Sequence, residues 1–226
     1  MDVYQAVASR RAVRAFTDEP VSEEVLTRVL RTAARAPSGG NIQPWHSYVL
    51  TGGALAEVTK RAAERLAAGD PGDEREFDSY PPALASPYRE RRFAAGEQRY
   101  AAMGIDRADT QGRAEAVAAN WNCFGAPAAL FCCLDRSMGA AQWADVGMYL
   151  QTVMLLLRAE GLHSCPQKAW SVYRRTVAEV VSPPAGLVLF CALSIGFEDT
   201  SAPHVRIDRA PIDETVTFLS WDRPNR

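Results

Sequence analysis

The amino-acid sequence predicts an α+β fold built as a single domain. Apolar residues at helical spacing and short apolar runs typical of strands are mixed along the chain, without the regular alternation of a doubly wound sheet. Hydrophobic residues make up 47% of the 226 residues and charged residues 23%, a balance typical of a protein with a full core. Neither a linker nor an internal repeat divides the chain, so we expect one domain over residues 1–226.

The first part of the chain predicts three helices and one strand. A short helix is expected over residues 2–8. Ser22 is the expected N-cap of a second helix, whose apolar residues recur at helical spacing until Pro37 and two glycines end it. Residues 46–51 are predicted to form a strand, and residues 54–68 a third helix.

The segment over residues 69–100 differs from the rest in composition. It is rich in Pro, Gly, Tyr and charged residues and has weak periodicity. A stretch of this length without clear elements is typical of a functional lid, and a solvated surface insertion is the open alternative. We place the bounds of the candidate lid at about residues 69–106.

A helix, a strand and a second helix are predicted next. The first helix is expected over residues 107–122, and Pro127 precedes an apolar strand that reads AALFCCLD. Residues 141–160 form the strongest helical pattern in the chain and are apolar nearly all round, which predicts a buried central helix. Gly161 is expected to end this helix.

The last part of the chain predicts one helix and two strands. Residues 169–181 are expected to be helical, and residues 187–195, LVLFCALSI, to form a core strand. A last short strand is expected over residues 215–220.

Composition limits the classes of partner and the location of the protein. The net charge of −2 provides no general attraction for nucleic acids. The five cysteines are odd in number and contain no C-x-x-C motif, so neither a disulfide framework nor a zinc site is expected, and a reducing cytoplasm fits best. The N-terminus has no apolar signal core and no run of 18 apolar residues occurs, so we expect neither a signal peptide nor a membrane span.

Two polar segments near the amino end predict a binding site, of which the first is SRRAVRAF at residues 9–16. It places Arg10, Arg11 and Arg14 within five positions. Guanidinium groups match the oxygens of a phosphate in pairs, so this segment can bind a phosphate; a solvated basic patch is the alternative. The chain contains neither the P-loop motif nor the G-x-G-x-x-G motif, which excludes the common nucleotide-binding loops.

The second polar segment, PSGGNIQPW at residues 37–45, follows the end of a helix. Its glycines let a flat ligand approach the main chain, and Asn41 and Gln43 can hydrogen-bond the edge of a heteroaromatic ring. A loop that merely turns the chain is the alternative. Together the two segments describe a phosphate site beside a slot for a planar, polar-edged ring, and flavin mononucleotide (FMN) has both parts.

Several segments are similar to those of the FMN-dependent nitroreductase family. They read SRRAVRAFTDEPVSEEVL, APSGGNIQPWHSYVLTG, NWNCFGAPAALF, WADVGMYLQTVMLLLRAEGLHSCPQ and GFEDTSAPHVRIDRAPIDETVTF, and they follow the family's order over almost the whole chain. Within the family, the chain resembles the nitrobenzoate-type reductases most. The resemblance implies a three-layer α+β sandwich with a mixed, mainly antiparallel sheet, in an intertwined homodimer that holds one FMN in each of two sites at the dimer interface.

The resemblance also implies which residues surround FMN. Those expected at the phosphate and the ribityl chain are Arg10, Arg11, Arg14 and Arg209, with Arg206 as a second late candidate. Those expected along the flavin ring, in part from the partner subunit, are Pro37, Ser38, Gly39, Asn41, Gln151, Cys165, Pro166 and Gln167. The chain departs from many relatives in the turn over residues 164–167, which reads SCPQ where they have Glu.

The reaction is expected to be carried by the flavin, because a cofactor of this kind supplies the electron transfer and the protein supplies binding and orientation. The resemblance implies a ping-pong cycle in which NAD(P)H is the donor and a nitroaromatic or a quinone is the acceptor. No side chain is expected to be catalytic. The three histidines are scattered, so no metal site is expected; His163 follows a helix end, where a positive charge suits the helix dipole.

Aromatic residues are the candidates for the walls of an acceptor pocket, because a flat acceptor stacks on rings. They are Tyr88, Trp121 and Phe124, and packing in the core is the alternative for the last two. The polar candidates near the acceptor are Arg89, Arg91, Arg92, Asn120 and Asn122, and for the arginines a solvated charge run is the alternative.

Two other functions remain open at this point. The same fold hosts reductive dehalogenation, azoline oxidation and flavin destruction, because a fold does not determine a reaction. A flavin-binding protein without turnover is the second alternative. The sequence does not choose between NADH and NADPH.

Overall fold

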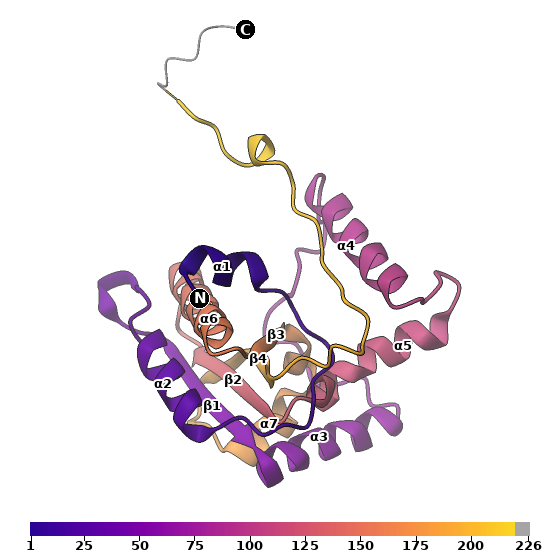
Figure 1. Ribbon diagram of the computed structural model, residues 1–226. Helices are drawn as coiled ribbons and strands as arrows, with labels where there is room; N and C mark the ends of the chain where they lie inside the picture. The colour runs from indigo at the N-terminus through magenta and orange to yellow at the C-terminus, as the bar shows by residue number, and fades with distance from the viewer. Residues whose placement is uncertain (220–226) are drawn as a thin grey trace, which may run out of the picture.

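The computed structural model describes residues 1–219, and a four-stranded sheet lies at its centre (Figure 1). The order of the strands is β1-β2-β4-β3, and each neighbouring pair is antiparallel. The strands are β1 (Trp45–Thr51), β2 (Ala128–Asp135), β3 (His163–Gln167) and β4 (Leu187–Gly196). The predicted α+β class is confirmed. Within the described residues the parallel contribution is limited to an isolated bridge between Ala12 and Ser164.

Strand β2 lies inside the sheet, and its burial explains why its sequence is a continuous apolar run. All of its residues except Asp135 are buried, because helices cover both faces of the sheet. It pairs with β4 from Ala128 opposite Ile195 to Asp135 opposite Leu187, with an irregularity between Cys132 and Cys133.

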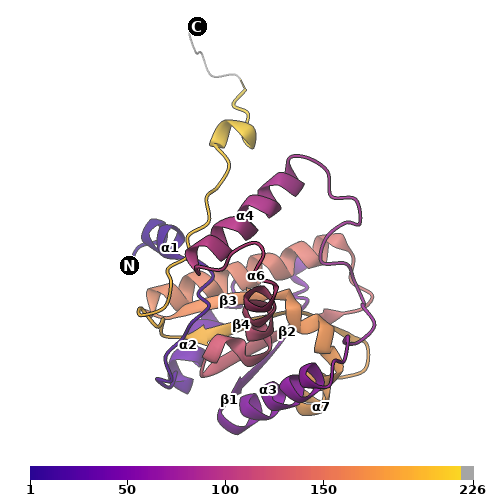
Figure 2. The ribbon, with the colours of Figure 1, turned by 90° about the vertical axis from the view of Figure 1, so that its right-hand side faces the viewer.

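Helices on both faces of the sheet make three layers (Figures 1 and 2). The helices on one face are α2 (Glu23–Ala33) and α6 (Ala140–Ala159), and α1 (Val3–Ser9) packs on α6. Those on the other face are α3 (Gly52–Ala67) and α7 (Arg174–Val181), with the 3-10 segments Ala119–Gly125 and Lys168–Tyr173. The three-layer sandwich is therefore confirmed.

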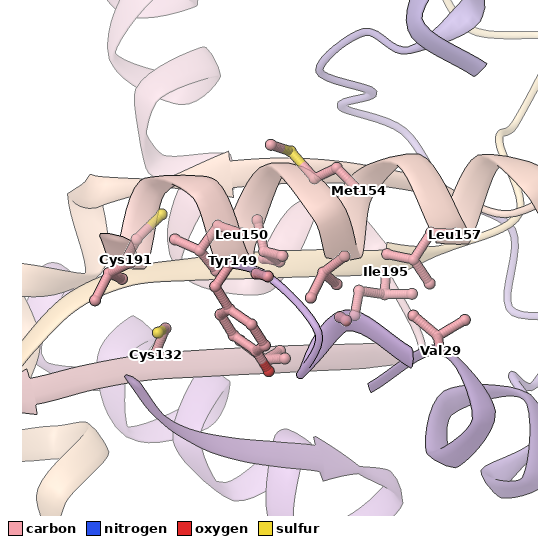
Figure 3. Close-up of a cluster of buried hydrophobic side chains, with 14 of the residues drawn as sticks. Val29, Cys132, Tyr149, Leu150, Met154, Leu157, Cys191 and Ile195 are labelled. Atoms are coloured by element: carbon pink, nitrogen blue, oxygen red, sulfur yellow. The ribbon is translucent and has the colours of Figure 1, made fainter. Parts of the chain in front are cut away.

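Helix α6 is the central helix that the apolar run predicts. Its inner face contributes Tyr149, Leu150 and Leu157 to an apolar cluster that also contains Val29 of α2 and Ile195 of β4 (Figure 3). The helix ends at its C-cap Glu160, and the next residue, Gly161, has a φ of +82°, a conformation that glycine adopts without strain.

Helix α4 (Tyr88–Ala102) corrects the expectation that residues 69–100 lack regular structure. The helix has no buried residue, so no apolar stripe marks it in the sequence. Helix α5 (Thr110–Ala118) is shorter than the predicted 107–122, because the 3-10 segment replaces its last turn.

Strand β3 corrects the expectation of a turn over residues 164–167. Proline lacks the N–H that a central strand needs, but β3 lies at the edge of the sheet, where Pro166 can pair with Leu193. The strand expected over 215–220 is also wrong as far as residue 219: this part follows a 3-10 turn, Ile212–Glu214, and is exposed. Residue 220 lies outside the described residues.

Among residues 1–219, no helix combines the length and the apolar character required to cross a bilayer.

Candidate functional site

A groove of about 760 Å³ lies between the end of α1, the end of α6 and the segment that follows β4. We call it the arginine groove, because six arginines line it: Arg10, Arg11, Arg14, Arg158, Arg206 and Arg209. The three arginines of the first polar segment and both late candidates therefore share one concave surface, although almost 200 positions separate them in the sequence.

Backbone pairing brings these distant segments together. The amide of Val13 donates to the carbonyl of Ser164 on β3 at 3.2 Å, and the amide of Thr17 donates to the carbonyl of Phe197 after β4 at 3.0 Å. Val13 and Phe16 are buried in the core, so the segment is held by its apolar residues while its arginines face the groove. The spacing of apolar residues between the arginines is the local reason for this arrangement.

The charges in the groove are unbalanced. Arg10 and Arg14 have no acidic partner among the described residues, whereas Arg11 is paired with Glu198. Burial and the neighbouring positive charge of Arg209 lower the pKa of Arg10 from its usual value. Cations that are held close together in a half-buried groove repel one another, so an anion bound there would stabilise the arrangement.

Arg158 belongs to the groove and was missed by the sequence reasoning. Its side chain donates to Ser9 Oγ at 3.3 Å and to the carbonyl of Leu162 at 2.8 Å, which joins the end of α6 to the end of α1. Arg158 lies in the last turn of α6, where a basic residue is common because it suits the helix dipole, so no local signal marks it as a binding residue.

His163 does not carry the positive charge expected of it. Burial, followed by the charges of Arg158 and Arg11, lowers its pKa to about 4, although Glu198 Oε2 lies 3.3 Å from Nε2. The ring is therefore neutral near pH 7. Within residues 1–219, no hydrogen-bond partner reaches its buried Nδ1. The favourable interaction with the helix dipole does not keep the ring charged, because the ring is partly buried and lies near Arg158 and Arg11.

The second polar segment forms a tight loop between α2 and β1. Gly40 and Asn41 have φ values of +59° and +58°, which glycine and asparagine tolerate best. The amide of Gly39 donates to Asp145 Oδ2 on α6 at 3.2 Å, and the amide of Gln43 donates to Ser38 Oγ at 3.0 Å. The loop is thus held open and exposed against α6.

This loop does not line the arginine groove within one chain. None of Pro37, Ser38, Gly39 and Asn41 is among the groove residues. Gln151 on α6 is also outside the groove, half-buried, two helical turns before Arg158 on the same face. The single chain therefore brings together the residues expected at the phosphate, whereas the loop expected along the flavin ring lies apart from them.

The β3 residues lie beside the groove with different exposures. Cys165 is buried, and burial raises the pKa of its thiol to about 11, which the charges of Arg14 and Arg99 partly oppose. The side chain of Gln167 donates through Nε2 to the carbonyl of Asn120 at 2.7 Å, and its Oε1 accepts a hydrogen bond from Ser194 Oγ. The polar atoms of Gln167 are therefore bonded within the protein. Of the three β3 residues expected along the flavin ring, Cys165, Pro166 and Gln167, only Pro166 is exposed.

Comparison with known proteins shows the family to which the chain belongs. The model of the Nitroreductase family matches residues 7–197, which include both polar segments and the whole sheet. The chain belongs to the nitroreductase family. A 4-nitrobenzoate reductase of Pseudomonas putida is 34% identical over 224 residues, 98% of this chain and 97% of the relative. A second 4-nitrobenzoate reductase, of Nocardioides sp., is 36% identical over 96% of this chain and 89% of the relative.

Solved structures of nitroreductases have the same fold as this family member. The crystal structure of the FMN- and NADPH-dependent nitroreductase NfnB from Sphigopyxis sp. strain HMH has a TM-score of 0.94 and 43% identity, and covers 98% of this chain and 100% of that one. The FMN-dependent NfnB from Mycobacterium smegmatis, in complex with NADPH, has a TM-score of 0.89 and 33% identity, and covers 96% and 99%.

The aromatic candidates for an acceptor pocket do not gather in this nitroreductase chain. Tyr88 begins α4 and is 61% exposed. Trp121 is half-buried, with its ring centroid 5.1 Å from that of Tyr173 and its Nε1 donating to the carbonyl of Ala169 at 3.3 Å. Phe124 is buried with the core residues on one face of the sheet, which favours the core alternative for this ring.

The three arginine candidates lie in the candidate lid over residues 69–106, which we call the excursion, and each has a partner there or nearby. Arg89 pairs with Glu90 at 2.7 Å, and Arg91 pairs with Glu214 at 2.8 Å. The guanidinium of Arg92 lies 4.1 Å from the ring centroid of Tyr80. The contacts of these arginines are those of a solvated, ion-paired helix.

The two asparagine candidates lie outside the excursion. The carbonyl of Asn120 accepts a hydrogen bond from Gln167, and Asn122 is exposed.

Proposed function

We propose that this protein is an FMN-dependent oxidoreductase that uses NAD(P)H to reduce nitroaromatic or quinone-type acceptors. The observation that carries the proposal is the arginine groove, in which Arg10 and Arg14 have no acidic partner among the described residues. The similarity to nitrobenzoate reductases and FMN-dependent nitroreductases over nearly the full chain supports the same activity.

The groove fits the phosphate of FMN in charge and in hydrogen-bonding capacity. A guanidinium donates to phosphate oxygens in pairs, and each charge-assisted hydrogen bond contributes about 1.5–3 kcal/mol. Arg10, Arg14 and Arg209 are the proposed phosphate ligands. Because the described groove contains more arginines than acids, the phosphate would reduce the repulsion between them.

When bound, FMN supplies the electron transfer between the nicotinamide donor and the acceptor. The side chains of this protein bind and orient it. Arg14 and Arg99 place positive charge beside Cys165 on β3, and such a field would stabilise negative charge on a ring bound near this strand. The thiol of Cys165 stays protonated and apolar there, because its pKa is raised to about 11.

The site is proposed to be completed by a second copy of the chain. The loop with Ser38, Gly39 and Asn41 lies outside the groove of its own chain, so a partner subunit is the proposed source of the ring-lining loop. Exposed apolar side chains on α1, among them Tyr4 at 84% and Val7 at 53% exposure, provide a surface suited to such a contact. We therefore propose a homodimer with two sites.

The excursion over residues 69–106 is proposed to act as a lid beside the acceptor. The start of the segment is anchored, because Phe77 packs on Trp143 and Phe190, while α4 has no buried residue. The proposed location of the protein is the cytoplasm, where its buried free cysteines would stay reduced.

A spectrum and a substrate panel test the proposal. We expect the purified protein to be yellow, or to become so with added FMN, and to oxidise NADH or NADPH when 4-nitrobenzoate or menadione is present. A protein that binds FMN but oxidises neither nucleotide with any acceptor would be a flavin carrier. A protein that does not bind FMN would contradict the proposal altogether.

A further inference from the structure

Glu198 places a negative charge inside the arginine groove, where the proposed ligand is an anion. The groove residues include two acids, Glu198 and Asp208. Asp208 is exposed and accepts a hydrogen bond from Gln98 at 2.9 Å. The side chain of Glu198, in contrast, is only 15% exposed. A half-buried carboxylate interacts more strongly with its neighbours than an exposed one, because water screens it less.

The backbone holds Glu198 at a fixed position beside the first polar segment. Glu198 pairs with Phe16 in an antiparallel bridge. The amide of Asp199 donates to the carbonyl of Ala15 at 3.0 Å, and the residue before Glu198 accepts from Thr17. Since both neighbours of Glu198 are hydrogen-bonded to this segment, its side chain leaves the backbone directly toward Arg11.

Three basic side chains face this carboxylate. Arg11 donates to Oε1, and its side chain is also only 15% exposed. His163 Nε2 lies 3.3 Å from Oε2, and His204 Nδ1 lies 4.0 Å from Oε1. With His163 neutral, the charge opposite Glu198 is that of Arg11. The two charges therefore form a nearly neutral pair within the groove.

We propose that Glu198 is a positioning residue that holds Arg11 and neutralises its charge, so that Arg11 does not bind the phosphate of FMN. This inference rests on the proposed function. The ligands that remain for the phosphate are Arg10, Arg14 and Arg209. Glu198 thereby lowers the affinity of the groove for anions, because its carboxylate repels them and occupies the guanidinium nearest to it.

Substitution of Glu198 by glutamine tests whether the carboxylate opposes the binding of FMN or supports it. Gln can still accept a hydrogen bond from Arg11 but carries no charge. We expect E198Q to bind FMN about fivefold more tightly than the parent at low salt, with the difference shrinking as salt is added. Riboflavin, which lacks the phosphate, should bind both proteins equally. The measurement is quenching of flavin fluorescence on titration.

Two further variants complete the design. E160Q is the matched control, because Glu160 is also paired with an arginine, Arg28 at 2.8 Å, but lies outside the groove; its FMN affinity should equal that of the parent. R11A should weaken FMN binding about fivefold in the parent background, because it leaves the charge of Glu198 unbalanced, and should return the E198Q variant to about the affinity of the parent.

The opposite results would overturn the inference. If the R11A/E198Q double variant binds FMN tenfold more weakly than the parent, Arg11 is a phosphate ligand; if E198Q weakens FMN binding while remaining folded by circular dichroism, the carboxylate supports the site. Should E198Q not fold, the double variant still decides, because it carries neither charge. A parent that does not bind FMN contradicts the proposed function, and the protection of parent and E198Q against heat by inorganic phosphate then tests the role of Glu198 separately.

Discussion

The charge of Arg10 is the residue-scale feature on which cofactor retention should depend most. Its guanidinium is half-buried and has no acidic partner among the described residues, and burial, followed by the charge of Arg209, lowers its pKa. We expect R10A to bind FMN at least about tenfold more weakly, the loss of one charge-assisted contact. The FMN content after gel filtration and the dissociation constant measure this.

Arg31 provides the control for R10A, because it is an exposed arginine on α2 outside the groove. R31A should retain FMN like the parent. Equal FMN affinity of R10A and R31A would remove Arg10 from the proposed site.

Phe124 and Tyr88 are distinguished by their burial, although both were candidates for the acceptor pocket. Phe124 is 6% exposed in the core, so F124A should lower the free energy of unfolding by about 3–5 kcal/mol. Tyr88 is 61% exposed, so Y88A should leave the melting temperature nearly unchanged and alter KM for the acceptor if this ring contacts it. A stable F124A variant with a changed KM would contradict the core assignment.

At the scale of elements, Arg65 on α3 anchors the start of the excursion. Its guanidinium donates to Asp70 at 2.7 Å and to Asp73 at 2.9 Å, and lies 4.7 Å from the ring centroid of Tyr173. Burial alone would raise the pKa of Asp73, but hydrogen bonds from Arg65 and from the Arg175 amide hold it below its usual value.

The depressed pKa of Asp73 gives the anchor a pH dependence. A carboxyl with a lowered pKa in the folded state stabilises it above the unfolded pKa of about 3.9, and this contribution is lost as the pH falls through the folded pKa. We expect hydrogen-exchange protection of residues 70–77 to decrease below about pH 4, relative to the core strands. R65A should show the same loss at pH 6.

Arg61 is the control for this experiment, because its partners, Glu57 and Glu179, lie outside the excursion. R61A should leave the protection of residues 70–77 unchanged at pH 6. If R65A exchanges like the parent in this segment, Arg65 is not its anchor.

The elements differ in how well the sequence predicts them, and burial explains the difference. Strands β2 and β4 and helix α6 were predicted within one residue at each end, because the two strands are buried over most of their length and helix α6 buries one full face in the core. Helix α4 has no buried residue and therefore no periodic signal. Strand β3 contains Pro166, which argued for a turn until the position at the sheet edge was known.

The site was predictable only in part, for a related reason. Arg10, Arg11 and Arg14 are adjacent in the sequence, so their charge density is a local signal. Arg158 and Glu198 enter the same groove from the end of a helix and from a loop, and no local pattern marks either one. A groove made by chain segments far apart in sequence becomes visible only when backbone pairing brings them together.

At the scale of the whole molecule, the exposed apolar face of α1 should be covered by a second subunit. We expect light scattering to give a mass about twice the 24.7 kDa of one chain. Y4D, on the exposed face of α1 but outside the groove, should shift the protein toward the monomer and weaken FMN binding in parallel, because the partner is the proposed source of the ring-lining loop. L66D, on the outer side of α3 and 37% exposed in the parent, should remain dimeric. A monomeric parent that binds FMN normally would contradict this arrangement.

Helix α4 and the chain segment that follows β4 run side by side and are joined by three contacts (Figures 1 and 2). Gln98 both donates to Asp208 and accepts from its amide, and Arg91 pairs with Glu214. The same segment carries Arg206 and Arg209 into the groove. Chimeras between relatives should therefore exchange helix α4 and this segment together. Exchange of either one alone would break the contacts between them and displace Arg206 and Arg209.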